Sequence, residues 1–137
     1  MAYTNQKEYE HANTNRNLYI LIVEDEDSLR NNLARFLRFH GYNVTTAKNG
    51  VQALESIRLH EFQVLLIDLR LPDMNGMDIL KEINLTGLNI ASMVITAHAS
   101  LKTVIDAFKY GACDYLEKPF QLAELEQKIK NFDVFIK

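Results

Sequence analysis

Five short apolar or β-branched segments, separated by stretches of helix length, constrain the fold of this 137-residue chain more than any other feature. The third segment contains the uninterrupted run Val64-Leu65-Leu66-Ile67, so both faces of that strand are apolar. Such strands are typical of a parallel sheet that is covered by helices on both faces. The five predicted strands span residues 18–23, 42–47, 62–67, 90–96 and 113–116. We therefore predict an α/β domain with a (βα)5 repeat and an open, doubly wound, five-stranded parallel sheet.

The segments between these strands, and the segment after the last, carry apolar residues at helical spacing. The predicted core-facing residues of the five helices are, in chain order, Leu29, Leu33, Phe36 and Leu37; Val51, Leu54 and Ile57; Ile79, Leu80 and Ile83; Val104, Ile105 and Phe108; and Leu122, Leu125, Ile129 and Phe132. Gly41, Gly87 and Gly111 follow three of these helices, and Asn49-Gly50 opens the second. Glycine after a helix and asparagine before one are common boundary signals.

Composition limits the classes of function. The chain is 47% hydrophobic and 24% charged, as in ordinary soluble domains, and its net charge of -3 argues against direct binding of nucleic acid, which needs a basic face. No apolar run is long enough to span a membrane and no signal peptide follows Met1, so we expect a cytoplasmic protein with no membrane partner. Cys113 is the only cysteine; it excludes an intrachain disulfide and is expected to be a small buried residue.

The first part of the chain differs from the rest. Residues 1–17 are polar and rich in asparagine and show no apolar period. Such composition cannot bury enough apolar surface to order a segment. We therefore predict a flexible N-terminal arm over 1–17 and a single domain over 18–137.

Polar side chains gather where the predicted strands end. Glu24 and Asp25 follow the first strand, Asp68 the third, Thr96 closes the fourth, and Lys118 follows the fifth. Because the carboxyl ends of parallel strands share one edge of the sheet, these side chains are expected to converge there. An ionised carboxylate at the end of a buried strand is costly unless a metal or a cationic partner offsets its desolvation.

The chemistry of this group points to phosphoryl transfer. Clustered carboxylates raise one another's pKa unless a cation is present. The candidate ligands are all oxygens, so the fitting ion is Mg²⁺, with Mn²⁺ as a possible substitute. A carboxylate such as Asp68 beside that ion can accept a phosphoryl group, while Lys118 and Thr96 stabilise its oxygens. The neighbouring Asp27 or Ser28 is expected instead to favour the N-terminus of the first helix.

Four segments, LIVEDEDSLR, VLLIDLRLPDMNG, VITAHAS and DYLEKPF, resemble the signature segments of bacterial response-regulator receiver domains. The resemblance covers residues 18–135, and the stretch VITAHASLKTVIDAFKYGACDYLEKPF is similar to receivers of enhancer-binding transcriptional activators. It implies a flavodoxin-like, CheY-like sheet with strand order 2-1-3-4-5. It also implies a two-component signalling switch that catalyses only its own aspartate phosphorylation and dephosphorylation.

The same resemblance assigns roles to individual residues. Asp68 would be the phosphoacceptor, and Asp25, Asp68 and the backbone carbonyl of Arg70 would bind Mg²⁺. Glu24 stands where the family usually has an aspartate and would reach the metal mostly through water. Thr96 and Lys118 would contact the phosphoryl group.

Further positions follow from the family pattern. Tyr115 matches an aromatic residue that rotates on activation, and the Lys118–Pro119 bond matches a cis peptide. Arg70 and His98 occupy variable positions that tune dephosphorylation.

The implied partners are a histidine kinase, a second copy of the chain and an output domain outside this sequence, which we expect to be transcriptional. The dimerisation or output face would combine the fourth helix, the fifth strand and the fifth helix. Its candidate charged residues are Lys102, Asp106, Lys109, Asp114, Glu124 and Lys128.

Two other classes of function fit the sequence less well. A haloacid-dehalogenase-type phosphatase needs D-x-D-x-T after the first strand, but Leu29 stands at the threonine position. A flavodoxin-like nucleotide-binding module needs a phosphate-cradling loop, and neither G-x-G-x-x-G nor G-x-x-x-x-G-K-[ST] occurs. The motif Asp73-Met74-Asn75-Gly76 predicts a turn before the third helix, and its early glycine does not fit a calcium loop.

Overall fold

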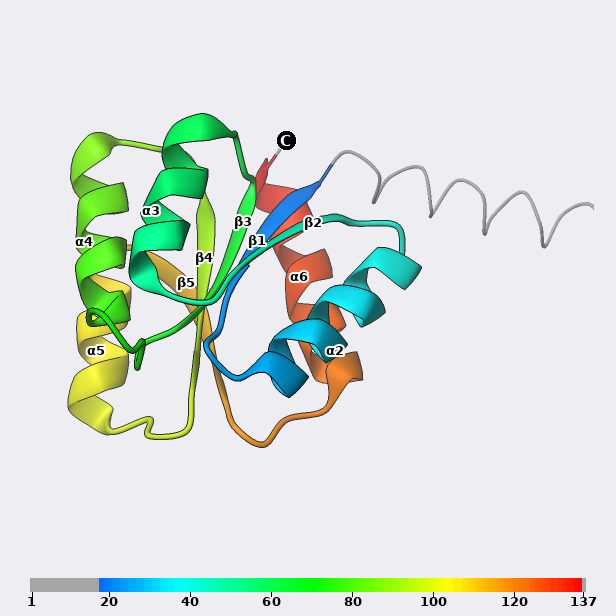
Figure 1. Cartoon of the computed structure of the whole chain (residues 1–137). Helices are drawn as coiled ribbons and strands as arrows, with labels where there is room; N and C mark the ends of the chain where they lie inside the picture. The colour runs from blue at the N-terminus through cyan, green and yellow to red at the C-terminus, as the bar shows by residue number, and fades with distance from the viewer. Residues whose placement is uncertain (1–17, 137) are drawn as a thin grey trace, which may run out of the picture.

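The five predicted strands form a single parallel sheet (Figure 1). The computed structural model describes residues 18–136, and the side chains as far as Phe132. The sheet order is β2-β1-β3-β4-β5, which confirms the predicted fold. The strands are β1 (Tyr19–Val23), β2 (Asn43–Ala47), β3 (Val64–Asp68), β4 (Ala91–Thr96) and β5 (Ala112–Glu117).

Helices cover both faces of this sheet. They are α2 (Asp27–Phe39), α3 (Gly50–Leu59), α4 (Gly76–Thr86), α5 (Leu101–Lys109) and α6 (Leu122–Ile136). Helices α2 and α6 pack on one face, and α3, α4 and α5 on the other (Figure 1). None of the helices in the described part of the chain combines the length and the apolarity needed to cross a bilayer. The predicted flexible arm, residues 1–17, lies outside the described residues.

Alternation along the central strands builds two separate cores. Val64 and Leu66 of β3 face α2 and α6, whereas Leu65 and Ile67 face α3, α4 and α5. All four side chains are buried, because successive residues of a strand point to opposite faces and both faces are covered. The two-sided core explains why this segment reads as one continuous apolar run.

The boundary signals lie where the sequence predicts them. Asn49 begins α3 and its side-chain oxygen accepts a hydrogen bond from the Gln52 amide. Asn75 begins α4 in the same way by accepting from the Met77 amide, so the predicted turn before this helix is confirmed. Gly87 ends α4 with a φ of 72°, a conformation that glycine adopts without steric cost.

Two predicted helix faces are only partly correct. Val51 of α3 and Ile105 and Phe108 of α5, all expected in the core, are exposed. The fully buried core side chains of these two helices are the small residues Ala53 and Ala107, and Leu54 and Ile57 of α3 pack against the core while partly exposed. A small residue brings the helix backbone close to the sheet, and the larger neighbours are then left on the outer side of the helix.

The prediction of a buried Cys113 is wrong, because its side chain is exposed. Cys113 belongs to β5, the edge strand, in which Ala112 and Leu116 are the buried residues. Ala112 packs in the core beneath α3, α4 and α5, whereas Leu116 packs in the core beneath α2 and α6. The pairing of β5 with β4 passes from Ser92–Ala112 to Met93–Asp114, so Cys113 is the extra residue of a local irregularity and stays exposed.

Replacement of Leu66 by alanine tests the core. Leu66 is fully buried at the centre of the sheet, so we expect Leu66→Ala to lower the free energy of unfolding by about 2–5 kcal/mol in urea denaturation. The matched control is Leu85→Ala, because Leu85 is 86% exposed and its loss should change stability by less than about 0.5 kcal/mol. Equal losses in the two variants would contradict the assignment of the core.

Candidate functional site

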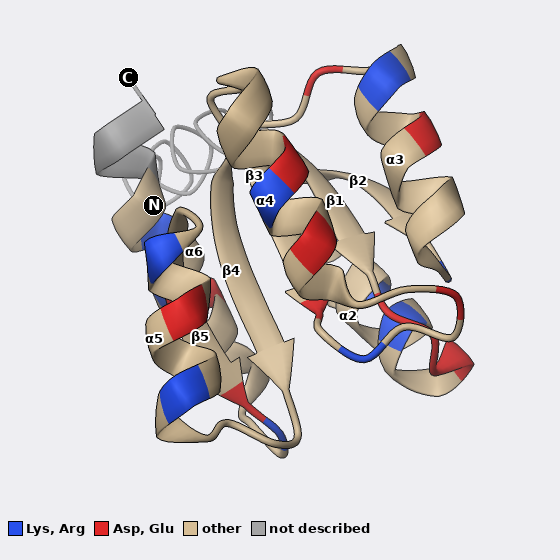
Figure 2. Ribbon diagram, turned by 90° about the vertical axis from the view of Figure 1, so that its left-hand side faces the viewer, with Lys and Arg blue, Asp and Glu red and all other residues tan. Residues whose placement is uncertain are grey.

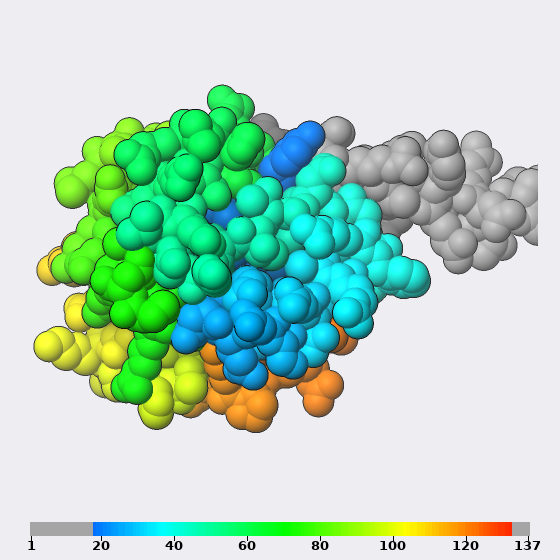
Figure 3. Space-filling view, in the orientation of Figure 1, coloured from blue at the N-terminus to red at the C-terminus, as the bar shows by residue number. Residues whose placement is uncertain are grey.

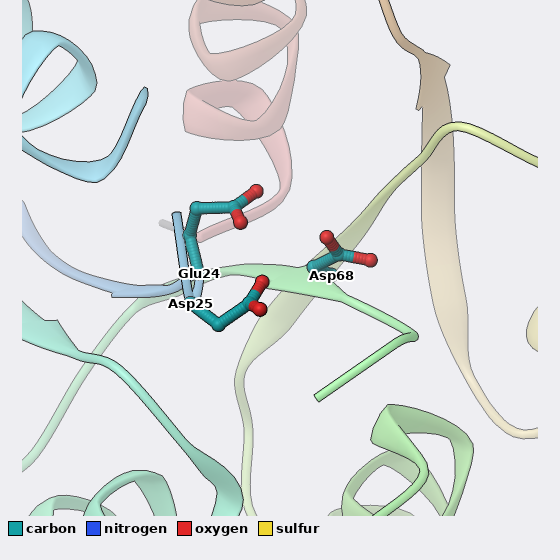
Figure 4. Close-up of side chains that lie close together, drawn as sticks. All are labelled: Glu24, Asp25 and Asp68. Carbon is teal, nitrogen blue, oxygen red and sulfur yellow. The ribbon is translucent and has the colours of Figure 1, made fainter. Parts of the chain in front are cut away.

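The ends of β1 and β3 bring three carboxylates together. Glu24, Asp25 and Asp68 each offer an oxygen atom, and these oxygens lie within 4.8 Å of one another. Figure 4 shows Glu24 and Asp25 beside the end of β1 and Asp68 across from them at the end of β3. Glu24 and Asp68 are buried, whereas Asp25 is exposed. The predicted convergence of these acids therefore occurs, with two of the three shielded from water.

Lys118 is the cation that makes this burial tolerable. Its Nζ lies 2.6 Å from Glu24 Oε1 and 2.7 Å from Asp68 Oδ2. Its backbone amide donates to the carbonyl of Thr96 at the end of β4, which places Lys118 at the same edge of the sheet. The Lys118–Pro119 peptide bond is cis. One ammonium thus bridges two acids from different strands.

This arrangement shifts the pKa of both kinds of group. Burial raises the pKa of Glu24, and the hydrogen bond from Lys118 offsets only part of that effect. Burial alone would lower the pKa of Lys118, but its hydrogen bonds to Asp68 and Glu24 outweigh burial and raise it. Lys118 therefore remains a firmly charged donor near neutral pH.

Backbone amides complete the contacts of the two buried acids. Asp68 Oδ1 accepts from the amide of Arg70 at 3.0 Å, and Glu24 Oε2 accepts from the amide of Glu26 at 3.0 Å. Each carboxylate thus has one oxygen on Lys118 and the other on an amide two residues further along the chain. Both side chains are held in fixed orientations before any ligand binds.

Arg30 supports the loop between β1 and α2, a role that was not predicted from the sequence. Its guanidinium donates to the carbonyls of Glu24 and Asp25, at 3.0 and 3.3 Å, and pairs with Asp27. The spacing of Asp27 and Arg30 on one helix predicts the ion pair. It does not predict the bonds to carbonyls, which depend on how the loop folds back over the helix.

The two predicted switch residues, Thr96 and Tyr115, lie in different surroundings. Thr96 is buried at the end of β4, and its hydroxyl oxygen accepts from the amide of His98 at 3.2 Å. Tyr115 is 37% exposed, and its ring lies edge-on to Phe108 with 6.4 Å between ring centroids. Thr96 therefore borders the acidic group, whereas Tyr115 points to the surface.

A cavity of about 420 Å³ between α4 and α5 opens beside Thr96. Arg70 and His98, the two predicted variable positions, line it and are exposed. Lys102 and Asp106 of α5 also line it. The charged residues that line this cavity are of both signs: Arg70, Lys81 and Lys102 are basic, and Asp78 and Asp106 are acidic.

The six charged residues predicted on the face formed by α5, β5 and α6 do not all remain available for a partner. Asp114 of β5 and Lys128 of α6 form an ion pair of 3.0 Å with each other. Lys109 lies 5.8 Å from the centre of the Tyr110 ring, and Glu124 is exposed. Basic and acidic positions alternate along α5 (Figure 2), so this face has no strong net charge of one sign.

The donor set fits a hard divalent cation. The grouped carboxylates offer oxygen ligands only, and Mg²⁺ prefers oxygen ligands and commonly takes one or two carboxylates. A carboxylate beside a metal and an ammonium is suited to receiving a phosphoryl group. The geometry therefore supports acceptance of a phosphoryl group better than hydrolysis by a metal-bound water alone.

Comparisons with known proteins agree with this interpretation. Residues 20–130 match the model of the response regulator receiver domain. The transcriptional regulatory protein ZraR of Escherichia coli K12 is 39% identical over 117 residues, which are 85% of this chain and 26% of that protein. The transcriptional regulatory protein CrdR of Helicobacter pylori is 40% identical over 114 residues, which are 82% of this chain and 54% of that protein. The chain thus spans between a quarter and about half of the length of these relatives.

Solved structures show the same likeness. A CheY-like response regulator receiver domain protein from Methanospirillum hungatei superposes with a TM-score of 0.84 at 29% identity, covering 87% of this chain and 95% of that one. The beryllofluoride-activated NtrC4 receiver domain dimer gives a TM-score of 0.81 at 32% identity, covering 87% and 98%.

Removal of Lys118 tests the electrostatics of the site. In Lys118→Met, Glu24 and Asp68 remain buried without a cation, so we expect a loss of about 3–5 kcal/mol in unfolding free energy near neutral pH in EDTA. The loss should grow as pH rises, because a buried carboxyl with a raised pKa keeps more protons in the folded state than in the unfolded chain. Added Mg²⁺ should restore part of the stability by binding the folded protein.

The matched control is Lys128→Met, which breaks the partly exposed pair with Asp114 and should cost no more than about 1 kcal/mol. A loss in Lys118→Met as small as in this control would show that the carboxylates do not depend on Lys118.

Proposed function

This chain belongs to the response regulator receiver domain family of two-component systems, and we propose that phosphorylation of Asp68 by a histidine kinase switches it between two states. The family is a signalling switch, and its members among the relatives above are transcriptional regulators. One observation carries the choice of residue. Asp68 shares the Lys118 ammonium and the carboxylate group with Glu24, but of the two only Asp68 belongs to the central strand β3, where it pairs with Ile95 beside Thr96 of β4.

Receiver domains bind Mg²⁺ at an acidic cluster, and Glu24, Asp25 and Asp68 form such a cluster here. In the proposal, Asp25, Asp68 and the backbone carbonyl of Arg70 are the protein ligands, and Glu24 contacts the ion through water. Mn²⁺ fits the same oxygen ligands. When bound, the ion supplies positive charge that offsets the charge on the phosphoryl oxygens.

The transfer forms one bond and breaks another. A carboxylate oxygen of Asp68 attacks the phosphorus of the kinase phosphohistidine, and the P–N bond breaks as the P–O bond forms. The electron pair of the broken bond stays on the imidazole of the kinase. Lys118 keeps its proton. Its ammonium donates a hydrogen bond to a phosphoryl oxygen, and this bond takes the place of the one that it donates to Asp68 before transfer. Water later attacks the phosphorus of the aspartyl phosphate near Arg70 and His98, which releases inorganic phosphate and restores the Asp68 carboxylate. The chain therefore acts on its own phosphoryl group and on no separate substrate.

Thr96 and Tyr115 carry the signal in this proposal. The Thr96 hydroxyl leaves the amide of His98 and donates to the phosphoryl group, which moves the loop after β4. Tyr115 then turns inward from its surface position against Phe108. A two-state change of this kind alters the face of α5, β5 and α6. Exposed apolar side chains on that face, such as Ile105 and Phe108, support its use as a contact surface.

The partners follow from the family and from the lengths of the relatives. ZraR and CrdR are longer than this chain, so we propose that a transcriptional output domain acts with the receiver domain. A cytoplasmic location, close to the kinase, belongs to the same proposal. Contact with DNA is assigned to the output domain and not to this acidic chain.

Intact-protein mass spectrometry after incubation with acetyl phosphate tests the phosphoacceptor. We expect a single phosphoryl adduct on the wild-type chain that requires Mg²⁺, and none on Asp68→Asn, because the amide cannot act as the nucleophile. Asp78→Asn is the control: Asp78 is an exposed acid on α4, and this variant should be phosphorylated like the wild type. An adduct on Asp68→Asn, or none on the wild type with Mg²⁺, would reject the proposal.

Sedimentation with beryllofluoride, which mimics the phosphoryl group, tests the proposed contact face. We expect the wild type to shift from monomer towards dimer when beryllofluoride is added. In Ile105→Glu the dimer dissociation constant should be at least about tenfold higher, because a charge buried in the contact opposes it. Leu85→Glu, which changes an even more exposed apolar side chain on α4, should dimerise like the wild type. Equal weakening in both variants would place the contact elsewhere.

A further inference from the structure

The loop between β3 and α4, residues 69–75, is tied to the start of a different helix. Asp73 lies on this loop, and its Oδ1 accepts from the amide of Gly50 at 2.8 Å. Its Oδ2 accepts from the amide of Val51 at 2.9 Å. Figure 3 shows the loop after β3 against the first turn of α3 on the molecular surface. These bonds join segments that are more than 20 residues apart in the chain.

The first turn of α3 has two amides that its own cap does not satisfy. Helices begin with amides that have no partner within the helix. Asn49, the cap residue, accepts from the amide of Gln52 at 2.8 Å, which leaves the amides of Gly50 and Val51. Asp73 accepts from both. The positive end of the helix favours this carboxylate, and the two amides hold the pKa of Asp73 below its usual range.

Side-chain packing strengthens the same contact. A Cβ atom added to Gly50 would lie 2.3 Å from Cγ of Met74, the neighbour of Asp73. Gly50 is buried, so the Met74 side chain lies directly on the backbone of the helix start. The loop is therefore attached to α3 by two charged hydrogen bonds and one close apolar contact.

The same loop continues into the phosphoryl-transfer site. The amide of Arg70 donates to Asp68 Oδ1, and Arg70 pairs with Asn75 through an isolated antiparallel bridge. The amide of Gly76 donates to the carbonyl of Leu69 at 2.8 Å. The base of the loop is thus closed by its own backbone, while Asp73 attaches its outer end to α3.

We propose that Asp73 is a positioning residue for phosphoryl transfer: by binding the start of α3, it holds the loop so that the Arg70 carbonyl and the Asp68 carboxylate keep the geometry that the metal requires. The inference rests on the proposed function. Mg²⁺ demands a nearly regular octahedral shell, so small movements of a carbonyl ligand weaken binding. Residues that orient metal ligands from behind commonly change metal affinity by about 10–100-fold when they are replaced.

Two variants of Asp73 separate the parts of this contact. Asp73→Asn keeps one acceptor and removes the charge, whereas Asp73→Ala removes both acceptors. We expect the Mg²⁺ dissociation constant, measured by calorimetry on the full chain, to rise about threefold in the first and about tenfold in the second. The phosphorylation rate with acetyl phosphate should fall by a similar factor at limiting Mg²⁺. At saturating Mg²⁺, most of the loss should disappear.

The control is Glu82→Gln, which removes the same charge from an exposed position on α4 and should leave Mg²⁺ affinity and rate unchanged. Urea denaturation of every variant shows whether it is folded under the conditions of the metal titration. A purely structural role would lower stability but leave the Mg²⁺ dissociation constant of the folded protein unchanged. That result in both Asp73 variants overturns the inference.

The wild type distinguishes the two proposals. If it binds Mg²⁺ and is phosphorylated, but the Asp73 variants match it, only the role of Asp73 is rejected. If it binds Mg²⁺ without accepting a phosphoryl group, the proposed function fails, and the metal titration still decides the role of Asp73. If it binds no Mg²⁺, both are rejected.

Discussion

The bridge from Lys118 to Glu24 and Asp68 is the interaction on which the site depends. Two acids are buried at one edge of the sheet, and each alone would oppose folding through the loss of its hydration. The ammonium lies within 2.7 Å of a carboxylate oxygen of each acid, so its single positive charge offsets the desolvation of both. A phosphoryl group arriving at Asp68 would compete for the same ammonium. The interaction that stabilises the resting site is thus the one that phosphorylation would rearrange.

The parallel sheet explains why these residues meet at all. Glu24, Asp68 and Lys118 come from the ends of β1, β3 and β5, and strands in parallel register end at a common edge. The three central strands, β1, β3 and β4, are almost entirely buried and mostly apolar. The rigid core therefore fixes where the strand ends lie, and the loops beyond them supply the chemistry. Rigid supports of this kind hold a site more accurately than loops alone.

The fold and the acidic group could be predicted from the sequence because each has a local signal: apolar runs for strands, and polar residues directly after them. The outward position of Ile105 and Phe108 could not, since helical spacing identifies an apolar face but not whether Ala107 lies closer to the sheet. Cys113 was misplaced because its exposure depends on how the edge strand β5 pairs with β4, including a register shift that no local pattern indicates. The bonds of Asp73 to α3 join distant segments, and no spacing in the sequence indicates them.

Glu24 shows how one extra methylene can be accommodated in such a site. Its Oε1 reaches Lys118 while its Oε2 accepts from the amide of Glu26, so both oxygens have partners within the chain. A carboxylate oxygen can accept more than one hydrogen bond, but a metal in direct contact would have to compete with the ammonium for Oε1. Asp25 is exposed, and in the described part of the chain no hydrogen bond or ion pair engages its carboxylate. Under the proposed function, Glu24 would therefore orient Lys118 and the loop, while Asp25 and Asp68 would bind the cation.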